Sequence, residues 1–344
     1  MNRRVFNSLV VWFASQGARV MGQDPTDIAH EATTKAATGP ATGPLDLLPT
    51  LGGMQFWQDE LVYHGWRIQR NVLTGHYRLL DERDWKIVSG SFDRCRDKLD
   101  EIKRQRSLPP LKSRVVLLVH GLFRSRGSMD NLGKYLAAQG EFEAMTVGYP
   151  STRAGVGQHA KGLASVIEHL NGVEEIDFVA HSLGNLVIRH YLADNTDPQT
   201  GRQGDPRIKR IVMLGPPNNG AQLAETFGQN TIFELVVGTS GQELSRGWSE
   251  LEKKLATPAC EFGVIAGGRG DEKGYNPLVQ GDDDGVVSVD SARLAGASDF
   301  LVLPILHTFM MEQRSVQDAT LCFLEHGYFT AADKRQPIPR GSVQ

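Results

Sequence analysis

Three short stretches of the sequence carry side chains that together could perform nucleophilic catalysis. Ser182 stands in "VAHSLGN", the acidic run 282–284 in "GDDDGVV", and His307 in "ILHTF". A serine hydroxyl becomes an effective nucleophile when an adjacent imidazole removes its proton, and a carboxylate can hold that imidazole in the correct tautomer. The three stretches therefore indicate acyl-transfer chemistry, with a serine, then an acid, then a histidine along the chain.

Ser182 taken alone has two interpretations. It follows an apolar run and precedes Leu183, Leu186, Val187 and Tyr191, which share one face of a predicted helix. A serine at that point is either a nucleophile lifted out of the backbone by a sharp, strained turn or an ordinary helix N-cap.

The turn interpretation requires small neighbours on both sides of the serine. Gly184 meets this need, whereas Ala180 stands where a nucleophile motif usually has glycine.

Elements that could position these residues follow from the hydrophobic pattern after Arg114. Helical patterns such as 129–138, 158–170 and 183–192 alternate with short apolar runs. The runs predict strands at 115–119, 142–149, 176–180, 208–214, 262–267 and 300–306. Alternation of this kind predicts an α/β fold, with a mostly parallel sheet covered by helices on both faces. Ligands of such sheets bind beyond the carboxyl ends of the strands, so the residues there are the candidate site.

Five segments at those strand ends resemble the motifs of the α/β-hydrolase family, in particular its bacterial lipase and esterase branch. They are "HGLFRS", "AHSLG", "GPPNNGA", "DDDG" and "LHTFM". The resemblance covers roughly residues 114–329. It implies the α/β-hydrolase fold, with a strained turn at the nucleophile and the chain order serine, acid, histidine.

The resemblance also implies a role for individual residues. Ser182 is the expected nucleophile, His307 the general base and Asp284 the acid, with Asp282 and Asp283 as solvated loop charges. The N–H groups of Leu122 and Leu183 are the expected oxyanion donors.

Phe123, His181 and Asn218 are expected to contact substrate. Packing for His181, and helix capping for Asn218, are the alternatives.

The chain organisation around this domain follows from composition. Residues 1–50 are read as a weak signal segment and a disordered linker, because Arg3 and Arg4 precede a short apolar run and "ATGPATGP" follows. Residues 51–110 predict a small appended module of β-sheet and helix, although its hairpin could instead supply the first strands of the main sheet. Residues 111–330 are the expected catalytic domain and residues 331–344 a disordered tail. The segment 220–260 is long enough to include a small lid.

Composition limits the partners. The formal net charge of −3 gives no electrostatic reason for nucleic acid as a main partner, and no stretch approaches a transmembrane helix in length. Three scattered cysteines favour buried thiols, with a Cys260–Cys322 bridge as the alternative in an exported protein. The acidic segments lack EF-hand spacing, so no metal and no other cofactor are expected. Export and a cytoplasmic location both stay open.

The expected function is a serine hydrolase that cleaves carboxylic esters of small molecules or lipids through an acyl-enzyme. A thioesterase, an amidase or an acyltransferase would use the same residues. The alternative from another class is a non-catalytic binding protein on a hydrolase scaffold, because fold alone does not determine function.

Overall fold

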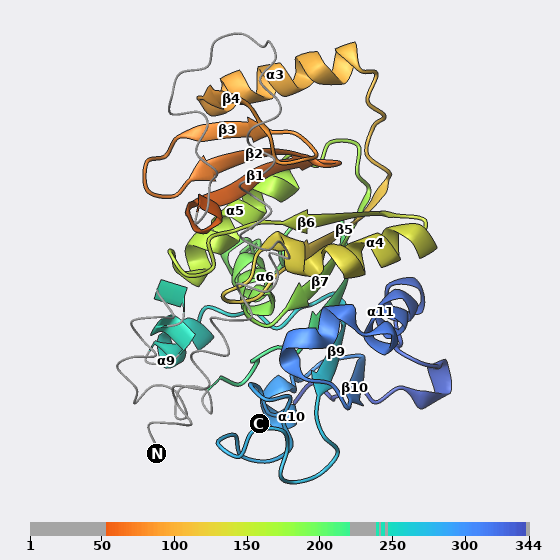
Figure 1. Cartoon of the computed structure of the whole chain (residues 1–344). Helices are drawn as coiled ribbons and strands as arrows, with labels where there is room; N and C mark the ends of the chain where they lie inside the picture. The colour runs from red at the N-terminus through yellow and green to blue at the C-terminus, as the bar shows by residue number, and fades with distance from the viewer. Residues whose placement is uncertain (1–52, 221–238, 241, 245–246, 342–344) are drawn as a thin grey trace, which may run out of the picture. The chain divides into compact units, whose positions relative to one another are not determined.

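The computed structural model describes residues 53–220, 239–240, 242–244 and 247–341 (Figure 1). The predicted signal segment and linker at 1–50, and most of the predicted lid, lie outside these residues. The chain divides into the units Met1–Gly53 and Met54–Gln344, and the second is described below.

Six parallel strands form the large sheet that the sequence predicts. They are β5 (Arg114–Val119), β6 (Glu143–Val147), β7 (Glu175–His181), β8 (Ile208–Leu214), β9 (Glu261–Gly267) and β10 (Asp299–Leu303). Their order is β10-β9-β8-β7-β5-β6, with each neighbouring pair parallel. The last strand is shorter than predicted and ends before Pro304, because proline restricts the preceding residue and cannot donate to a sheet.

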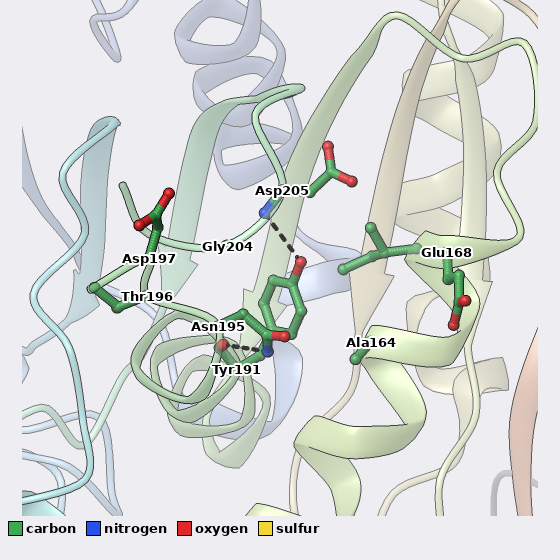
Figure 2. A pocket seen from close by; sticks show the side chains of 9 residues that line it. Ala164, Glu168, Tyr191, Asn195, Thr196, Asp197, Gly204 and Asp205 are labelled. Atoms are coloured by element: carbon green, nitrogen blue, oxygen red, sulfur yellow. Dashed lines mark hydrogen bonds between the residues drawn. The ribbon is translucent and has the colours of Figure 1, made fainter. Parts of the chain in front are cut away.

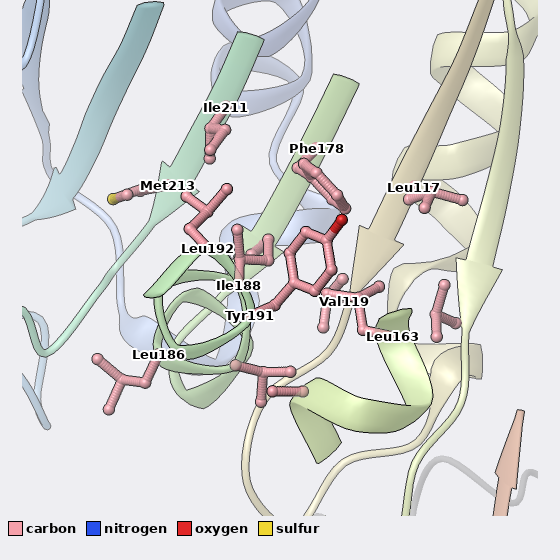
Figure 3. Close-up of a cluster of buried hydrophobic side chains, with 14 of the residues drawn as sticks. Leu117, Val119, Leu163, Phe178, Leu186, Ile188, Tyr191, Leu192, Ile211 and Met213 are labelled. Carbon is pink, nitrogen blue, oxygen red and sulfur yellow. The ribbon is translucent and has the colours of Figure 1, made fainter. Parts of the chain in front are cut away.

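Alternate side chains of these strands enter two cores, one on each face of the sheet. On one face, Leu117 and Phe178 pack with residues of α5 (Val156–Glu168) and α6 (Leu183–Asp194), as Figure 3 shows. On the other, Leu118 and Val179 pack with residues of α4 (Asp130–Gln139) and α11 (Arg314–His326). Burial on both faces explains why the strands read as continuous apolar runs, and the predicted α/β fold with a mostly parallel sheet covered by helices on both faces is confirmed.

The connections of the large sheet create a switch point between β5 and β7. The chain leaves β5 through α4 to reach β6 at one edge, and it leaves β7 through α6 to reach β8 on the other side. Loops that diverge in this way open a crevice at the carboxyl ends of the two strands, which is where ligands of such sheets bind.

A separate antiparallel sheet lies N-terminal to the large one (Figure 1). Its strands are β1 (Trp57–Tyr63), β2 (Trp66–Asn71), β3 (Tyr77–Leu80) and β4 (Lys86–Gly90), preceded by the short helix η1 (Gly53–Phe56). Helix α3 (Phe92–Gln105) buries Cys95, Leu99 and Ile102 against it. The predicted appended sheet and helix are confirmed, and the sheet supplies no strand to the large one.

The sequence pattern missed one turn in this small sheet. The stretch 61–71 reads as a single strand, but the chain reverses at His64 and Gly65, so that Tyr63 pairs with Trp66. His64 has a φ of 51°, which a two-residue hairpin turn requires and which a non-glycine residue rarely adopts.

Shorter elements complete the described chain. They are η2 (Arg126–Met129), α9 (Trp248–Glu252), α10 (Val289–Ala292), η3 (His307–Glu312) and η4 (Ala332–Lys334). None of the helices in the described ranges is long and apolar enough to cross a membrane.

The predicted disordered tail is wrong for residues 331–341. Gln336 N–H donates to Asp299 Oδ1 at 2.8 Å, and Ile338 exchanges backbone hydrogen bonds with Gly296 and Ala297. These bonds satisfy the backbone groups of the tail and attach it to the loop before β10.

All three cysteines are free thiols. The alternative bridge between Cys260 and Cys322 is therefore not formed.

Candidate active site

Ser182 occupies a strained turn between β7 and α6. Its backbone has φ 53° and ψ −121°, a conformation that side chains rarely adopt and that persists where the surrounding structure imposes it. Its side chain makes no capping hydrogen bond to the helix, so the interpretation as an ordinary N-cap is wrong. Gly184 is required beside it, because a Cβ there would lie 2.5 Å from the Val119 carbonyl oxygen.

His307 and Asp284 form a buried pair beyond the ends of β9 and β10. The imidazole Nδ1 donates to Asp284 Oδ2 at 2.7 Å. The other carboxylate oxygen, Oδ1, accepts from the N–H groups of Val286 at 3.0 Å and Val287 at 2.7 Å. Asp284 is 1% exposed, and its fully occupied oxygens fix both its orientation and the tautomer of His307. The Nε2 of a neutral His307 is then left as a proton acceptor.

Strand β8 brings the serine and the histidine together. Ser182 N–H donates to the carbonyl of Leu214 at 2.9 Å, and the next residue, Gly215, passes beside the buried pair. A Cβ on Gly215 would lie 3.0 Å from His307 Nδ1 and 3.2 Å from Asp284 Oδ2. Within the described chain no hydrogen bond joins the Ser182 hydroxyl to His307, as is common before substrate binds.

His181 links the serine turn to the histidine loop. Its Nε2 donates to the His307 carbonyl at 3.0 Å, and the two rings lie 4.6 Å apart. Burial, and then the nearby His307, lower the pKa of His181 well below its usual value, so the ring is neutral at pH 7. The contact with His307 places His181 behind the site rather than on a substrate-facing surface.

The loop after β5 runs against the serine turn. A Cβ on Gly121 would lie 3.0 Å from the Ser182 Cβ, so the backbone that leads to Leu122 adjoins the nucleophile position. Phe123 is half-buried in this loop and has a φ of 57°. Leu183 begins α6, where N–H groups lack intrahelical acceptors and the helix dipole favours negative charge. Both residues predicted to donate to the oxyanion thus adjoin Ser182, Leu183 as the next residue and Leu122 through Gly121.

Two expected roles do not match the described contacts. Asn218 is buried, and its amide is engaged, since Nδ2 donates to the Ala292 carbonyl and Oδ1 accepts from Arg189. It therefore braces the loop after β8 and has no free group for substrate. The expectation that Asp283 is a solvated charge is also wrong, because its carboxylate is buried. Asp282 is only half-buried, so it keeps part of its surface in solvent, as expected. Asp282 accepts from Arg269 and Gly270.

Asp283 is 0% exposed and accepts from the N–H groups of Asn276 and Gly285. Burial raises the pKa of its carboxyl group. The carboxylates of the acidic run thus bind backbone N–H groups of their own loop. No cluster of three metal-ligating side chains occurs in the part of the chain that the structure describes.

One residue beside the oxyanion loop, Tyr149, is not among the predicted site residues. Tyr149 follows β6, stacks on the ring of His120 at 4.2 Å, and donates its hydroxyl to the His120 carbonyl. Its position at the end of the strand predicted at 142–149 was the available signal, because residues at strand ends carry function in this class of sheet.

Burial of His120, His159 and His181 predicts that the free energy of unfolding decreases in acid, and the size of the effect follows for the first two. Burial lowers the pKa of His120 to about 4 and that of His159 to about 3, whereas an unfolded histidine titrates near 6.5. Between these values the unfolded chain binds more protons than the folded chain, so the free energy of unfolding falls as the pH drops from about 6.5 to 4. Each of the two should cost about 2 kcal/mol between pH 7.5 and pH 5.

Urea unfolding at the two pH values measures this loss. A His159→Gln variant cannot titrate at this position, so its stability should fall by about 2 kcal/mol less than that of the wild type over the same interval. Equal losses in the two proteins would contradict the buried, neutral state of His159.

A cavity of about 540 Å³ lies away from Ser182 (Figure 2). Tyr191 and Asn195 line it from the far end of α6, about 14 Å and 20 Å along the helix from the serine. Tyr191 accepts from the N–H of Asp205, and carboxylates from Glu168, Asp197 and Asp205 surround the opening. The cavity is therefore no part of the candidate active site.

Comparisons with known proteins give distant likenesses. The family model described as a domain of unknown function (DUF7379) matches residues 85–245, less than half of the 344 residues. A search of curated proteins finds no match. An inhibited esterase B from Lactobacillus rhamnosis is 11% identical, with 93% of this chain and 96% of that chain covered at a TM-score of 0.47.

Two further solved structures are similar to this chain at comparably low identity. A thermophilic esterase from Thermogutta terrifontis is 16% identical, with 64% of this chain and 92% of that chain covered at a TM-score of 0.41. Staphylococcus hyicus lipase is 13% identical, with 63% and 95% covered at a TM-score of 0.41. Identities of 11–16% with TM-scores below 0.5 assign the chain to none of these proteins' families.

Proposed function

We propose that this protein is a serine hydrolase that cleaves carboxylic esters through an acyl-enzyme. One observation carries the proposal: the strained Ser182 turn, at the switch point of the sheet, adjoins the buried Asp284–His307 pair. A helix cap would need neither the strain nor the pair. Perturbed geometry that the surrounding structure holds in place is a mark of functional sites.

The proposed reaction has two halves, acylation of Ser182 and hydrolysis of the acyl-enzyme, and the same residues act in both. His307 Nε2 takes the proton of Ser182 as the serine oxygen bonds to the acyl carbon, and Asp284 stabilises the resulting imidazolium. The N–H groups of Leu122 and Leu183 hold the oxyanion. The intermediate then expels the alcohol, which takes the proton from His307. Water repeats the sequence on the acyl-enzyme and releases the acid.

Hydrolysis assays on the full-length protein test the proposal and distinguish an esterase from a thioesterase or an amidase. The substrates are p-nitrophenyl esters, thioesters and anilides, each made with one short and one long acyl chain, so that at either chain length only the leaving group differs. We expect esters to be hydrolysed with the highest kcat/KM. Faster turnover of the thioester or anilide would assign that class instead, and a folded protein without activity on any of them would support a binding scaffold.

A further inference from the structure

Asp59, in strand β1 of the small sheet, holds the residue that follows β6 of the large sheet. Its backbone N–H donates to the Gly148 carbonyl at 2.9 Å, and its Oδ2 accepts from the Gly148 N–H at 2.7 Å. Both polar groups of Gly148 are thus bound by one residue, which lies 89 positions earlier in the chain. Asp59 is 0% exposed, so water does not compete for these bonds.

Arg67 and Gln69 complete a buried polar network around Asp59. Arg67 pairs with Asp59 at 2.5 Å and also donates to the carbonyl and the hydroxyl of Thr146, at 2.7 Å and 3.1 Å. Gln69 donates to the other carboxylate oxygen at 2.7 Å. Burying such a pair costs desolvation energy, so the pair itself is weak evidence for a gain in stability. The contacts of Arg67 with Thr146 and of Asp59 with Gly148 hold the end of β6 in place.

The end of β6 is bound in turn to the loop that carries the proposed oxyanion donor. Tyr149, next to Gly148, donates its hydroxyl to the His120 carbonyl and its N–H to His120 Nε2 at 3.4 Å. The two rings stack with an interplanar angle of 10°. His120 Nδ1 donates to the Gly121 carbonyl at 2.9 Å, so the backbone is held up to the peptide before Leu122.

A second contact joins the small sheet to the same loop. Asp84, in the turn between β3 and β4, forms an ion pair with Arg126, four residues after Leu122. Asp84 has a φ of 63°, so the turn presents it in a conformation that aspartate adopts more readily than most residues.

We propose that the small sheet is a positioning element of the active site, with Asp59 and Asp84 holding the loop 120–126 so that the Leu122 N–H points at the oxyanion. The proposal rests on the proposed function, since it needs an oxyanion to stabilise. None of these side chains touches the reacting atoms, and each acts through the backbone of the loop. Donors held in place before the reaction are worth more than donors that must reorganise during it.

Asp59→Asn is the first test, with Asp177→Asn as its matched control. Asp177 is also 0% exposed, pairs with Arg114 at 2.6 Å and accepts from the Arg210 N–H, but it lies at the opposite end of the large sheet. Both variants should lose stability, because each removes a buried carboxylate that pairs with an arginine, Arg67 for Asp59 and the half-buried Arg114 for Asp177. Only Asp59→Asn should lower kcat, by roughly tenfold with KM within about twofold, because the lost interaction acts in the transition state.

Inhibition by a trifluoromethyl ketone, which forms a tetrahedral oxyanion on the serine, gives a readout that stability does not change. Its inhibition constant should rise by the same factor as kcat falls in Asp59→Asn and stay unchanged in Asp177→Asn. Equal effects of the two variants, or no effect of Asp59→Asn, would overturn the positioning role while the wild type remained an active esterase. A wild type without activity would instead overturn the proposed function.

Asp84→Asn keeps the test decisive if Asp59→Asn does not fold. Asp84 is a half-exposed partner on the surface, so its loss should leave the fold intact. Asp93→Asn, which breaks the exposed Asp93–Arg96 pair within α3, is the control. We expect kcat to fall about threefold in Asp84→Asn alone, and unchanged kcat and inhibition there would overturn the proposal.

Discussion

Replacing Ser182 with alanine should lower kcat for ester hydrolysis by about six orders of magnitude while leaving the fold intact. The hydroxyl is the only group that can form the acyl-enzyme in the proposed reaction, so oxyanion donors and substrate binding alone would remain. Stability should change little, because the Ser182 side chain makes no capping hydrogen bond. Burst kinetics with a p-nitrophenyl ester and urea unfolding measure the two effects separately.

Ser91 offers a matched control, since it is a true helix cap. Its hydroxyl accepts from the Arg94 N–H at 3.3 Å at the start of α3. Ser91→Ala should cost about 1 kcal/mol of stability and leave kcat unchanged. If Ser182→Ala behaved like Ser91→Ala, losing stability and keeping activity, Ser182 would be a cap and the catalytic assignment would fall.

Asp284→Asn should lower kcat by about four orders of magnitude. The N–H groups of Val286 and Val287 need an acceptor, so the amide oxygen of the asparagine would turn toward them. Its NH₂ group would then face His307 and force Nδ1 to accept. That tautomer carries its proton on Nε2, where it cannot take one from Ser182. Steady-state kinetics at pH 8, with circular dichroism as a check of folding, measure the loss.

Asp282→Asn is the control for this prediction. The Asp282 carboxylate accepts from the N–H groups of Arg269 and Gly270, and an asparagine oxygen can replace one of those contacts. We expect kcat to stay within about threefold of the wild type. A larger loss in Asp282→Asn than in Asp284→Asn would show that the acid has been wrongly chosen.

The hydrophobic pattern was sufficient to predict the large sheet, because six strands buried on both faces have to be continuous apolar runs. It also placed Ser182 and His307 at strand ends, where side chains of distant segments converge. Asp284 was distinguished from its two neighbours by the glycine after it. In the structure Asp284 alone of the three contacts His307.

Long-range polar contacts could not be predicted in the same way. Nothing in the local sequence tells that Asp59 binds Gly148, because the pair depends on how two sheets meet across 89 residues. The segment around Asp283 has the composition of a solvated loop, yet the loop folds around the Asp283 carboxylate and buries it. The role of Asn218 was inferred from its place after a strand, whereas its partner Arg189 lies on helix α6. The hydrophobic pattern predicts secondary structure and turns, but it does not predict which groups a polar side chain will bind.

Labelling with a fluorophosphonate, followed by mass spectrometry of the intact protein and its peptides, tests the central claim most directly. Such a probe bonds covalently to a serine only where a base activates the hydroxyl and donors stabilise the resulting oxyanion. We expect one adduct per chain on the peptide that contains Ser182, and none in Ser182→Ala. A folded wild type that stays unlabelled, or that carries its adduct on another residue, would contradict the assignment of Ser182 as an activated nucleophile.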